Sequence, residues 1–279
     1  MPTDAYNYTM ISVEIEEGVA WATVDNPPIN LITLPLFGEL RQLGLDIEAD
    51  DDVRVLVLRS ANPDFFLAHF DVNAILGFPT EGEAKRSDNN VYHAMCENYK
   101  TMDTVTLAQI EGRVGGGGSE LALSFDMRFG VLGRTRINQM EVPIGILPGG
   151  SGTQSLPRLV GRGRALEIIL GAEDLDAATA ESWGYLNRAL PAEEIGPFVD
   201  RLARRIAGFP PEAVRLAKQS VGHAQAPEPQ GLVEESYLFD RLLRTQDAQN
   251  AMREFLALGG QTPEGEAEVA VLSGRVGRS

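Results

Sequence analysis

The stretch Gly112-Arg113-Val114-Gly115-Gly116-Gly117-Gly118-Ser119-Glu120 decides the fold, because four consecutive glycines join a predicted strand to a predicted helix. An apolar strand is expected over 106–111, and a helix is expected to begin directly after the glycines, over 119–125. Glycines leave backbone N–H groups unobstructed, and a helix N-terminus adds the positive end of its dipole. The combination is suited to holding a negative charge. A flexible linker is the alternative, but apolar runs on both sides place the glycines inside a domain.

Strand and helix patterns alternate on both sides of these glycines. Upstream, we expect a hairpin of strands, an amphipathic helix and a further strand, over 10–15, 19–24, 33–47 and 53–58. Downstream, we expect a strand, two helices and a final β segment, over 127–132, 164–170, 177–183 and 185–190. About four such repeats predict an α/β architecture. The polar segment 73–104 is either a cover beside a site or a surface excursion.

The β patterns end near Ile195. Four helices are expected beyond that point, over 198–207, 211–221, 233–245 and 248–258. The Gly- and Glu-rich end, 259–279, is expected to be a tail or a loosely packed arm. We therefore divide the chain into a core, 1–205, and a helical C-terminal region, 206–279.

Charge excludes several functions. The chain has 24 Lys and Arg against 40 Asp and Glu, for a net charge of −16. This balance argues against binding to nucleic acid or to anionic membranes, both of which need dense basic surface. The one cysteine, Cys96, cannot form an intramolecular disulfide, and neither a signal peptide nor an apolar run of about 18 residues is visible. A cytoplasmic location is expected.

Several common catalytic motifs do not fit. No Gly-Lys-Ser/Thr follows the glycines, and no acidic residue closes a dinucleotide-binding unit. The three histidines, His69, His93 and His223, are too dispersed to indicate a metal site. Ser151 lacks the final glycine of a nucleophile elbow.

Several spaced motifs, in the expected order from about Ile11 to Leu258, resemble the crotonase (enoyl-CoA hydratase/isomerase) superfamily. They are Asn26-Pro27-Pro28-Ile29-Asn30-Leu31, Phe66-Leu67-Ala68-His69-Phe70-Asp71-Val72, Gly116-Gly117-Gly118-Ser119-Glu120 with Asp126, and Glu141 with Gly145-Ile146-Leu147-Pro148-Gly149-Gly150-Ser151-Gly152. The resemblance implies a crotonase-like spiral of ββα turns with a helical C-terminal region that packs in trimers, often paired into hexamers.

The resemblance also implies the chemistry. In this family a thioester carbonyl oxygen lies between two backbone N–H groups, which by position are those of Phe70 and Gly117. Two such amides stabilise an enolate, and removing one typically costs ~10²–10³ in rate. The substrate is carried on coenzyme A, and no other cofactor and no metal is expected. Further substrate-binding residues are expected in the surrounding motifs: Asn30, Leu31, Ala68, His69, Asp71, Val72 and Gly116.

Two glutamates, Glu120 and Glu141, match the pair used by family members that hydrate a double bond. Hydration needs one group to position water and another to handle the proton on the α-carbon, so we assign Glu120 mainly to water and Glu141 mainly to the proton. Two carboxylates in one half-apolar pocket repel each other and can share a proton. The alternative for Glu120 is a carboxylate that only complements the helix dipole.

The sequence departs from the family at two places. His69-Phe70 stands where the family usually carries Gly and Ala, so the benzyl group is expected to narrow the acyl pocket, and His69 is expected near its mouth as a titratable group. The family often binds the CoA phosphates with a cation just after the loop aspartate and just after the last helix, but the stretches 71–73 and 255–261 contain none. Enoyl-CoA hydration is the leading hypothesis. Isomerisation, decarboxylation, thioester hydrolysis and a non-catalytic acyl-CoA-binding role stay open.

Overall fold

The computed structural model describes residues 6–81, 89–223 and 229–276, and part of the segment 73–104 therefore lies outside the described residues. Two sheets form the centre. The six-stranded sheet has the order β1-β2-β3-β5-β7-β10, and its members are Ile11–Glu16, Val19–Val24, Val55–Ser60, Val105–Ile110, Met127–Val131 and Arg188–Leu190. The four-stranded sheet has the order β4-β6-β8-β9, and its members are Phe65–Leu67, Arg113–Gly115, Arg136–Asn138 and Leu175–Asp176.

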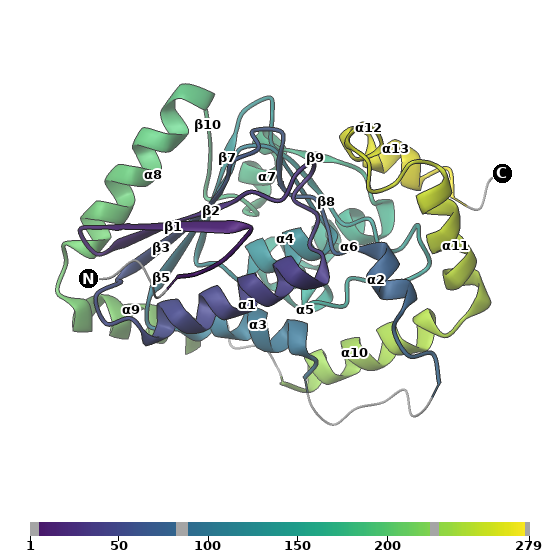
Figure 1. Ribbon diagram of the computed structural model, residues 1–279, viewed down its shortest axis with the longest axis horizontal. Helices are drawn as coiled ribbons and strands as arrows, with labels where there is room; N and C mark the ends of the chain where they lie inside the picture. The colour runs from purple at the N-terminus through teal and green to yellow at the C-terminus, as the bar shows by residue number, and fades with distance from the viewer. Residues whose placement is uncertain (1–5, 82–88, 224–228, 277–279) are drawn as a thin grey trace.

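The chain passes repeatedly from one sheet to the other. Strand β3 continues into β4, β5 into β6, and β7 into β8, and each strand pairs in parallel with its counterpart from the next turn. Two antiparallel pairs complete the sheets, the predicted hairpin β1–β2 and the pair β8–β9. The α/β fold with repeating ββα turns is thus confirmed (Figure 1).

Alternation along the strands places the core on both faces of the larger sheet. Val19 and Trp21 of β2 pack against α8 (Ala192–Ala207), while Ala20 and Ala22 face the opposite side. That side is covered by α1 (Leu34–Ala49) and α3 (Val91–Thr101). Figure 1 shows α8 on one side of the sheet and α1 with α3 on the other.

Helix α4 (Gly116–Leu123) begins earlier than predicted. The expected start was Ser119, yet three of the four glycines form the first turn. The cause is close approach: a Cβ on Gly118 would lie 2.4 Å from the carbonyl oxygen of Leu67. Only glycine lets the helix begin this near to β4, so the glycines serve packing as well as exposure of N–H groups.

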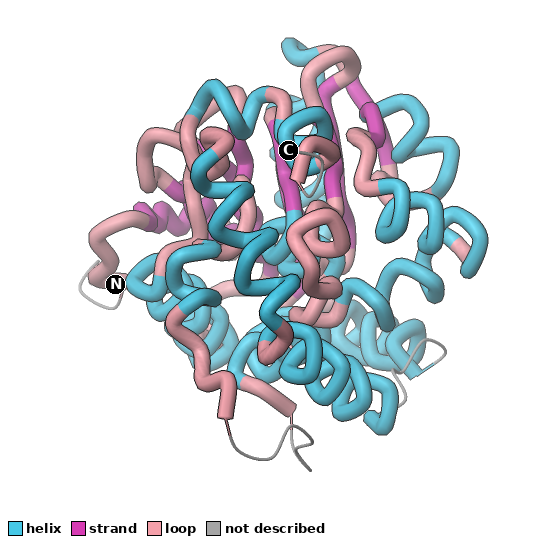
Figure 2. Tube along the Cα trace, turned by 90° about the vertical axis from the view of Figure 1, so that its right-hand side faces the viewer, coloured by secondary structure: helices cyan, strands magenta, loops and turns pink. Residues whose placement is uncertain are grey.

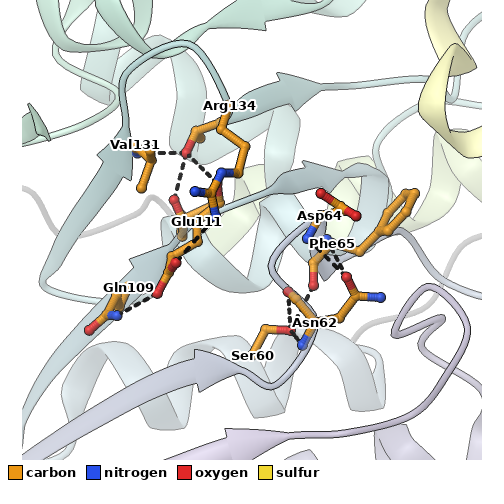
Figure 3. Close-up of polar contacts among 10 residues, drawn as sticks. Ser60, Asn62, Asp64, Phe65, Gln109, Glu111, Val131 and Arg134 are labelled. Carbon is orange, nitrogen blue, oxygen red and sulfur yellow. Dashed lines mark hydrogen bonds and ion pairs between the residues drawn. The ribbon is translucent and has the colours of Figure 1, made fainter. Parts of the chain in front are cut away.

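The loop between β3 and β4 is held by its own polar groups (Figure 3). The Asn62 side-chain oxygen accepts from the amides of Asp64 at 2.9 Å and Phe65 at 3.3 Å, while the Ser60 hydroxyl donates to the Phe65 carbonyl at 2.7 Å. The buried Asn30 amide adds a bond to Ser60 at 2.7 Å and bonds to the carbonyls of Phe65 and Phe66. These contacts fix the direction in which the chain enters β4 and the segment that follows it.

The remaining helices surround the spiral and form the C-terminal region. They are α2 (Val72–Leu76), α5 (Gly152–Val160), α6 (Arg162–Gly171), α7 (Ala177–Trp183), α9 (Pro211–His223), α10 (Pro229–Leu243), α11 (Gln246–Ala257), α12 (Pro263–Ala267) and α13 (Val269–Ser273). Position 205 falls inside α8, and the division into two domains stays a prediction. Among the described residues, no helix has both the length and the apolar character needed to cross a membrane.

The expectation of a loose tail over 259–279 is wrong for the described part of that segment. Val269 and Leu272 are buried in a cluster with α11 and with Val72 and Ile75 of α2. Figure 2 looks onto the side of the molecule that carries these C-terminal helices. Gly259, with φ of 105°, and the buried Glu266 belong to this folded segment, and composition alone does not distinguish it from a disordered tail.

Candidate active site

A cavity of about 370 Å³ lies beside the N-terminus of α4. Phe70, Gly117, Glu120 and Glu141, the four predicted catalytic and oxyanion-hole residues, all line it. Much of the remaining wall is apolar and includes Leu34, Phe37, Ile75, Phe78, Pro79, Ile146, Leu147 and Phe239. Sites for small ligands commonly combine such a wall with a few convergent polar groups.

The backbone at Phe70 turns its N–H away from the neighbouring strand segment. Phe70 forms a parallel bridge with Ile32, in which Ile32 N donates to the His69 carbonyl at 2.8 Å and Asp71 N donates to the Ile32 carbonyl at 3.0 Å. In this pattern the N–H of Phe70 itself points to the opposite side. A Cβ on Gly117 would lie 3.4 Å from Phe70 N, so the two predicted donors are neighbours. Gly117 is in the first turn of α4, where N–H groups have no intrahelical acceptor.

Glu120 is buried, with 3% of its surface exposed, and one of its oxygens is held by two main-chain amides. Oε1 accepts from Gly150 N at 2.8 Å and from Gly152 N at 2.7 Å. Between these glycines, Ser151 has φ of 107°, a conformation that is strained for a residue with a side chain. The carboxylate therefore ties α4 to the loop that leads into α5 and holds that loop in a strained conformation.

Glu141 lies beside Gly116 and is also buried, with 7% of its surface exposed. With the Gln139 amide oriented as its partners require, Gln139 donates to both oxygens of Glu141, at 3.0 and 3.2 Å, and accepts from Ser119 Oγ at 3.0 Å. Gly116, at φ of 44°, leaves room for this carboxylate, because a Cβ there would lie 3.1 Å from Glu141 Oε1. Gln139 was missed by the sequence analysis, and no local pattern distinguishes it.

Tyr92 is a further wall residue, and the sequence did not show whether α3 would reach the site. Its hydroxyl donates to the Gly117 carbonyl at 2.6 Å, and its ring stacks on Phe37 at 5.6 Å between centroids. Phe70 packs edge-on against the same ring at 5.9 Å. Burial away from water raises the pKa of Tyr92 well above its usual value, so this hydroxyl remains a donor at neutral pH.

His69 does not lie near the mouth of the pocket, so that expectation is wrong. The residue is 2% exposed, and its Nε2 lies 2.8 Å from Glu266 Oε1 of α12. Its Nδ1 lies 2.8 Å from the carbonyl oxygen of Phe70. Glu266 was missed by the sequence analysis because the two residues are 197 positions apart.

The other predicted substrate-binding residues surround this centre and are not among the described lining of the cavity. The Asn30 side chain supports β4, Leu31 packs with Ala68, and Gly116 separates His69 from Glu141. Asp71 caps the N-terminus of α2, and Val72, the first residue of that helix, is buried. Contact of these residues with a substrate stays a prediction. Within 6–81, 89–223 and 229–276, no cluster of His, Cys, Asp and Glu could hold a metal ion.

One cation that the sequence could not place lies at the cavity. Arg244, directly after α10, is among the lining residues together with Asp240 and Ser236 of that helix. A guanidinium here is the kind of group that binds phosphate or polar parts of a ligand.

Known proteins match nearly the whole chain. A family model described as Enoyl-CoA hydratase/isomerase matches residues 14–259. The Short-chain-enoyl-CoA hydratase of Clostridium acetobutylicum is 30% identical over 249 residues, which cover 88% of this chain and 94% of that protein. A solved structure of a candidate enoyl-CoA hydratase from Streptomyces avermitilis has 37% identity and a TM-score of 0.89, covering 98% of this chain and 100% of that one. A solved structure of Pseudomonas aeruginosa DspI has 29% identity and a TM-score of 0.71, covering 92% and 97%. The chain belongs to the enoyl-CoA hydratase/isomerase family of the crotonase superfamily, and is most like the enoyl-CoA hydratases.

Proposed function

We propose that the protein adds water across the 2,3 double bond of an enoyl-CoA thioester. The observation that carries this proposal is the convergence of two carboxylates, Glu120 and Glu141, with the neighbouring amides of Phe70 and Gly117 on one apolar cavity. An isomerase needs one group that moves a proton, and Glu141 alone could do that. The second carboxylate supports hydration, which must also position water.

In the proposed reaction, the thioester oxygen accepts hydrogen bonds from Phe70 N and Gly117 N. Addition of the water oxygen to C3 moves the electron pair of the double bond toward the carbonyl, and the two amides stabilise the resulting enolate. Glu120 starts as a carboxylate, positions the water and takes its proton, while Glu141 starts protonated and delivers its proton to C2. Transfer of a proton from Glu120 to Glu141 then restores the starting state. General acid–base groups of this kind typically contribute 10²–10⁴ in rate, in addition to ~10²–10³ for each oxyanion donor.

The way Glu120 is held supports its assignment to water. Its Oε1 is engaged by the two amides of the loop before α5, at 2.8 and 2.7 Å. Oε2 lies beside Gly150 and Tyr92: a Cβ added to Gly150 would be 2.7 Å from this oxygen and 2.6 Å from the Tyr92 ring. One oxygen thus anchors the side chain while the other is turned toward the lining of the cavity.

The acyl group would lie among aromatic rings. Phe70 contacts Phe37, Tyr92 and Phe78, with ring centroids at 6.0, 5.9 and 6.2 Å. This wall favours an apolar acyl group. The proposal also includes coenzyme A as the carrier of the acyl group and no other cofactor. It further includes assembly into a trimer or hexamer and a cytoplasmic location.

The test is turnover of crotonyl-CoA, followed by loss of the absorbance of the conjugated thioester and by identification of the product. Glu120→Gln and Glu141→Gln are compared with Glu181→Gln, a control at an exposed glutamate of α7. We expect a 3-hydroxyacyl product, a rate decreased by ~10²–10⁴ in both site variants and no change in the control. Absence of hydration on short, medium and aromatic enoyl-CoAs would refute the proposal, and a shifted double bond in the product would assign an isomerase instead.

A further inference from the structure

The C-terminal helices contact the backbone segment that carries the Phe70 amide. Glu266 Oε1 lies 2.8 Å from His69 Nε2, and the same oxygen accepts from Gln261 N at 2.7 Å. Gln261 also bonds to that segment, since its Nε2 donates to Asp71 Oδ1 at 2.7 Å and its Oε1 accepts from Val72 N at 2.8 Å. The segment 69–72 is therefore fastened to a part of the chain almost two hundred residues away.

The protonation state of His69 follows from what its two nitrogens face. Nδ1 lies 2.8 Å from the Phe70 carbonyl, which can only accept, so Nδ1 must carry a hydrogen. Nε2 lies 2.8 Å from Glu266 Oε1, so one hydrogen lies between these two atoms. With this hydrogen on Nε2 the pair is an imidazolium and a carboxylate, and with it on Oε1 both groups are neutral.

The surrounding charges favour the imidazolium and the carboxylate. Burial lowers the pKa of His69, but the Glu266 carboxylate, the Phe70 carbonyl and the more distant Glu141 raise it, and the net direction is upward. Burial raises the pKa of Glu266, but His69 and then Arg113 lower it, and the net direction is downward. Arg113 of β6 donates to the Glu266 carbonyl through Nε and pairs with Asp174 at 2.6 Å. The apolar neighbour is Phe255 of α11, whose ring centroid lies 6.0 Å from that of His69.

We propose that the His69 imidazolium and the Glu266 carboxylate form a positioning pair that holds the main chain at Phe70 so that its N–H faces the cavity. The peptide group before Phe70 is fixed by Ile32, and the one after it is fixed by His69 Nδ1 and again by Ile32. Because His69 is held by Glu266, the orientation of the Phe70 amide depends on the charge state of the pair. This inference rests on the proposed function, in which that amide binds the thioester oxygen.

Loss of the proton breaks the arrangement. A neutral His69 keeps one of its two hydrogen bonds, and its other nitrogen then presents a lone pair to an oxygen. If Nδ1 loses its hydrogen, the Phe70 carbonyl must move away and the peptide group after Phe70 turns with it. If Nε2 loses its hydrogen, Glu266 no longer holds the ring that fixes this carbonyl. A misplacement of about 1 Å at a reacting centre can cost as much as ~10²-fold in rate.

The pair is tested with Glu266→Gln, which keeps the size of the side chain and removes its charge. The matched control is Glu264→Gln, because Glu264 is an exposed residue of the same short helix. We expect kcat for crotonyl-CoA to fall by about 10-fold to 100-fold in Glu266→Gln with a far smaller change in KM. In the wild type, kcat should decrease as the pH rises through the raised pKa of His69, and in Glu266→Gln this decrease should move to lower pH. The control should match the wild type in both respects.

A purely structural pair would behave differently. Glu266→Gln would then lower the melting temperature but leave kcat and its pH dependence unchanged in the folded protein, and that result overturns the proposal. His69→Gln is the second variant. It removes the titrating group, so any remaining activity should lose the alkaline decrease.

Nitrogen NMR of the histidines separates this inference from the proposed function, since it needs no turnover. Both ring nitrogens of His69 should be protonated at pH 7, with the signal assigned by its absence in His69→Gln. The Phe70 amide resonance should shift as His69 titrates. A neutral His69 at pH 7, or a Phe70 amide that ignores its titration, overturns the positioning role. Failure to hydrate any enoyl-CoA while both NMR results hold refutes only the proposed reaction.

Discussion

Substitution of Glu120 separates its structural contribution from its catalytic one. Its Oε1 accepts from Gly150 N and Gly152 N, both of which are buried. Glu120→Ala leaves two buried N–H groups without an acceptor, at a cost of about 1–3 kcal/mol each, so the free energy of unfolding should fall by about 2–6 kcal/mol. Glu120→Gln retains an oxygen that can accept both bonds.

The glutamine variant should therefore be only moderately destabilised. Two hydrogen bonds to a charged acceptor, worth about 1.5–3 kcal/mol each, become neutral bonds worth about 0.5–1.5 kcal/mol. The difference amounts to about 2–3 kcal/mol for the pair. Hydration of crotonyl-CoA should nevertheless fall by ~10²–10⁴, because an amide cannot take a proton from water.

Urea unfolding and steady-state hydration by the folded protein measure the two effects on the same samples. The reasoning requires alanine to be clearly less stable than glutamine while both lose activity. Equal stabilities would refute the role of Oε1 as an anchor for the loop before α5. A glutamine variant with more than about a tenth of the wild-type rate would refute the assignment of Glu120 to proton transfer.

Three further outcomes are expected. Gly117→Ala should fold, but its rate of substrate hydration should fall by ~10²-fold or more, because the added Cβ would lie 3.4 Å from Phe70 N and occupy space beside the two donors. Gly118→Ala should instead lower the stability of the fold, since its Cβ would lie 2.4 Å from the Leu67 carbonyl oxygen. Circular dichroism and the hydration assay distinguish the two effects. Phe70→Ala keeps the amide but removes the ring, so the ratio of kcat/KM for longer over shorter enoyl chains should rise by about tenfold. The stabilisation by the His69–Glu266 pair should be greatest between pH 4.5 and 6.5. Because the pKa of His69 is raised in the folded protein, its contribution to stability is complete below pH 6.5 and disappears as the pH rises through the folded pKa. Because the pKa of Glu266 is lowered, its contribution is present above pH 4.5 and disappears as the pH falls through the folded pKa. Urea unfolding of wild type and Glu266→Gln across this range measures it.

Long, periodic elements could be predicted from the sequence, and very short ones could not. The hairpin β1–β2, helix α1 and strands β3, β5 and β7 were expected within a few residues of where they occur. Strands β4, β6, β8 and β9 have two or three residues each, too few to show the alternation that identifies a strand. Their existence depends on pairing between successive turns of the spiral, which is information from the tertiary structure.

The candidate site divides in the same way. Glu120, Glu141, Phe70 and Gly117 belong to contiguous motifs, and the structure brings all four to one cavity. The residues that hold them came from elsewhere. Tyr92 reaches Gly117 from α3, and Gln139 reaches Glu141 from the end of β8, in positions with no distinguishing local pattern. A hydrogen bond between distant segments leaves no periodic trace in either one.

The presence of His69 in the segment 69–72 and the ordered C-terminal arm have one explanation. An imidazole placed where small residues are usual must be buried, and a buried imidazolium is costly unless a carboxylate accompanies it. Glu266 supplies that charge, but it can do so only if 259–276 folds back onto the segment 69–72, as the bonds from Gln261 show. The apolar cluster formed by Val269 and Leu272 with α2 and α11 gives that arm a reason to stay in place. A His-Phe segment without the arm would leave His69 without its paired carboxylate, so the departure near residue 69 requires the ordered structure near residue 266.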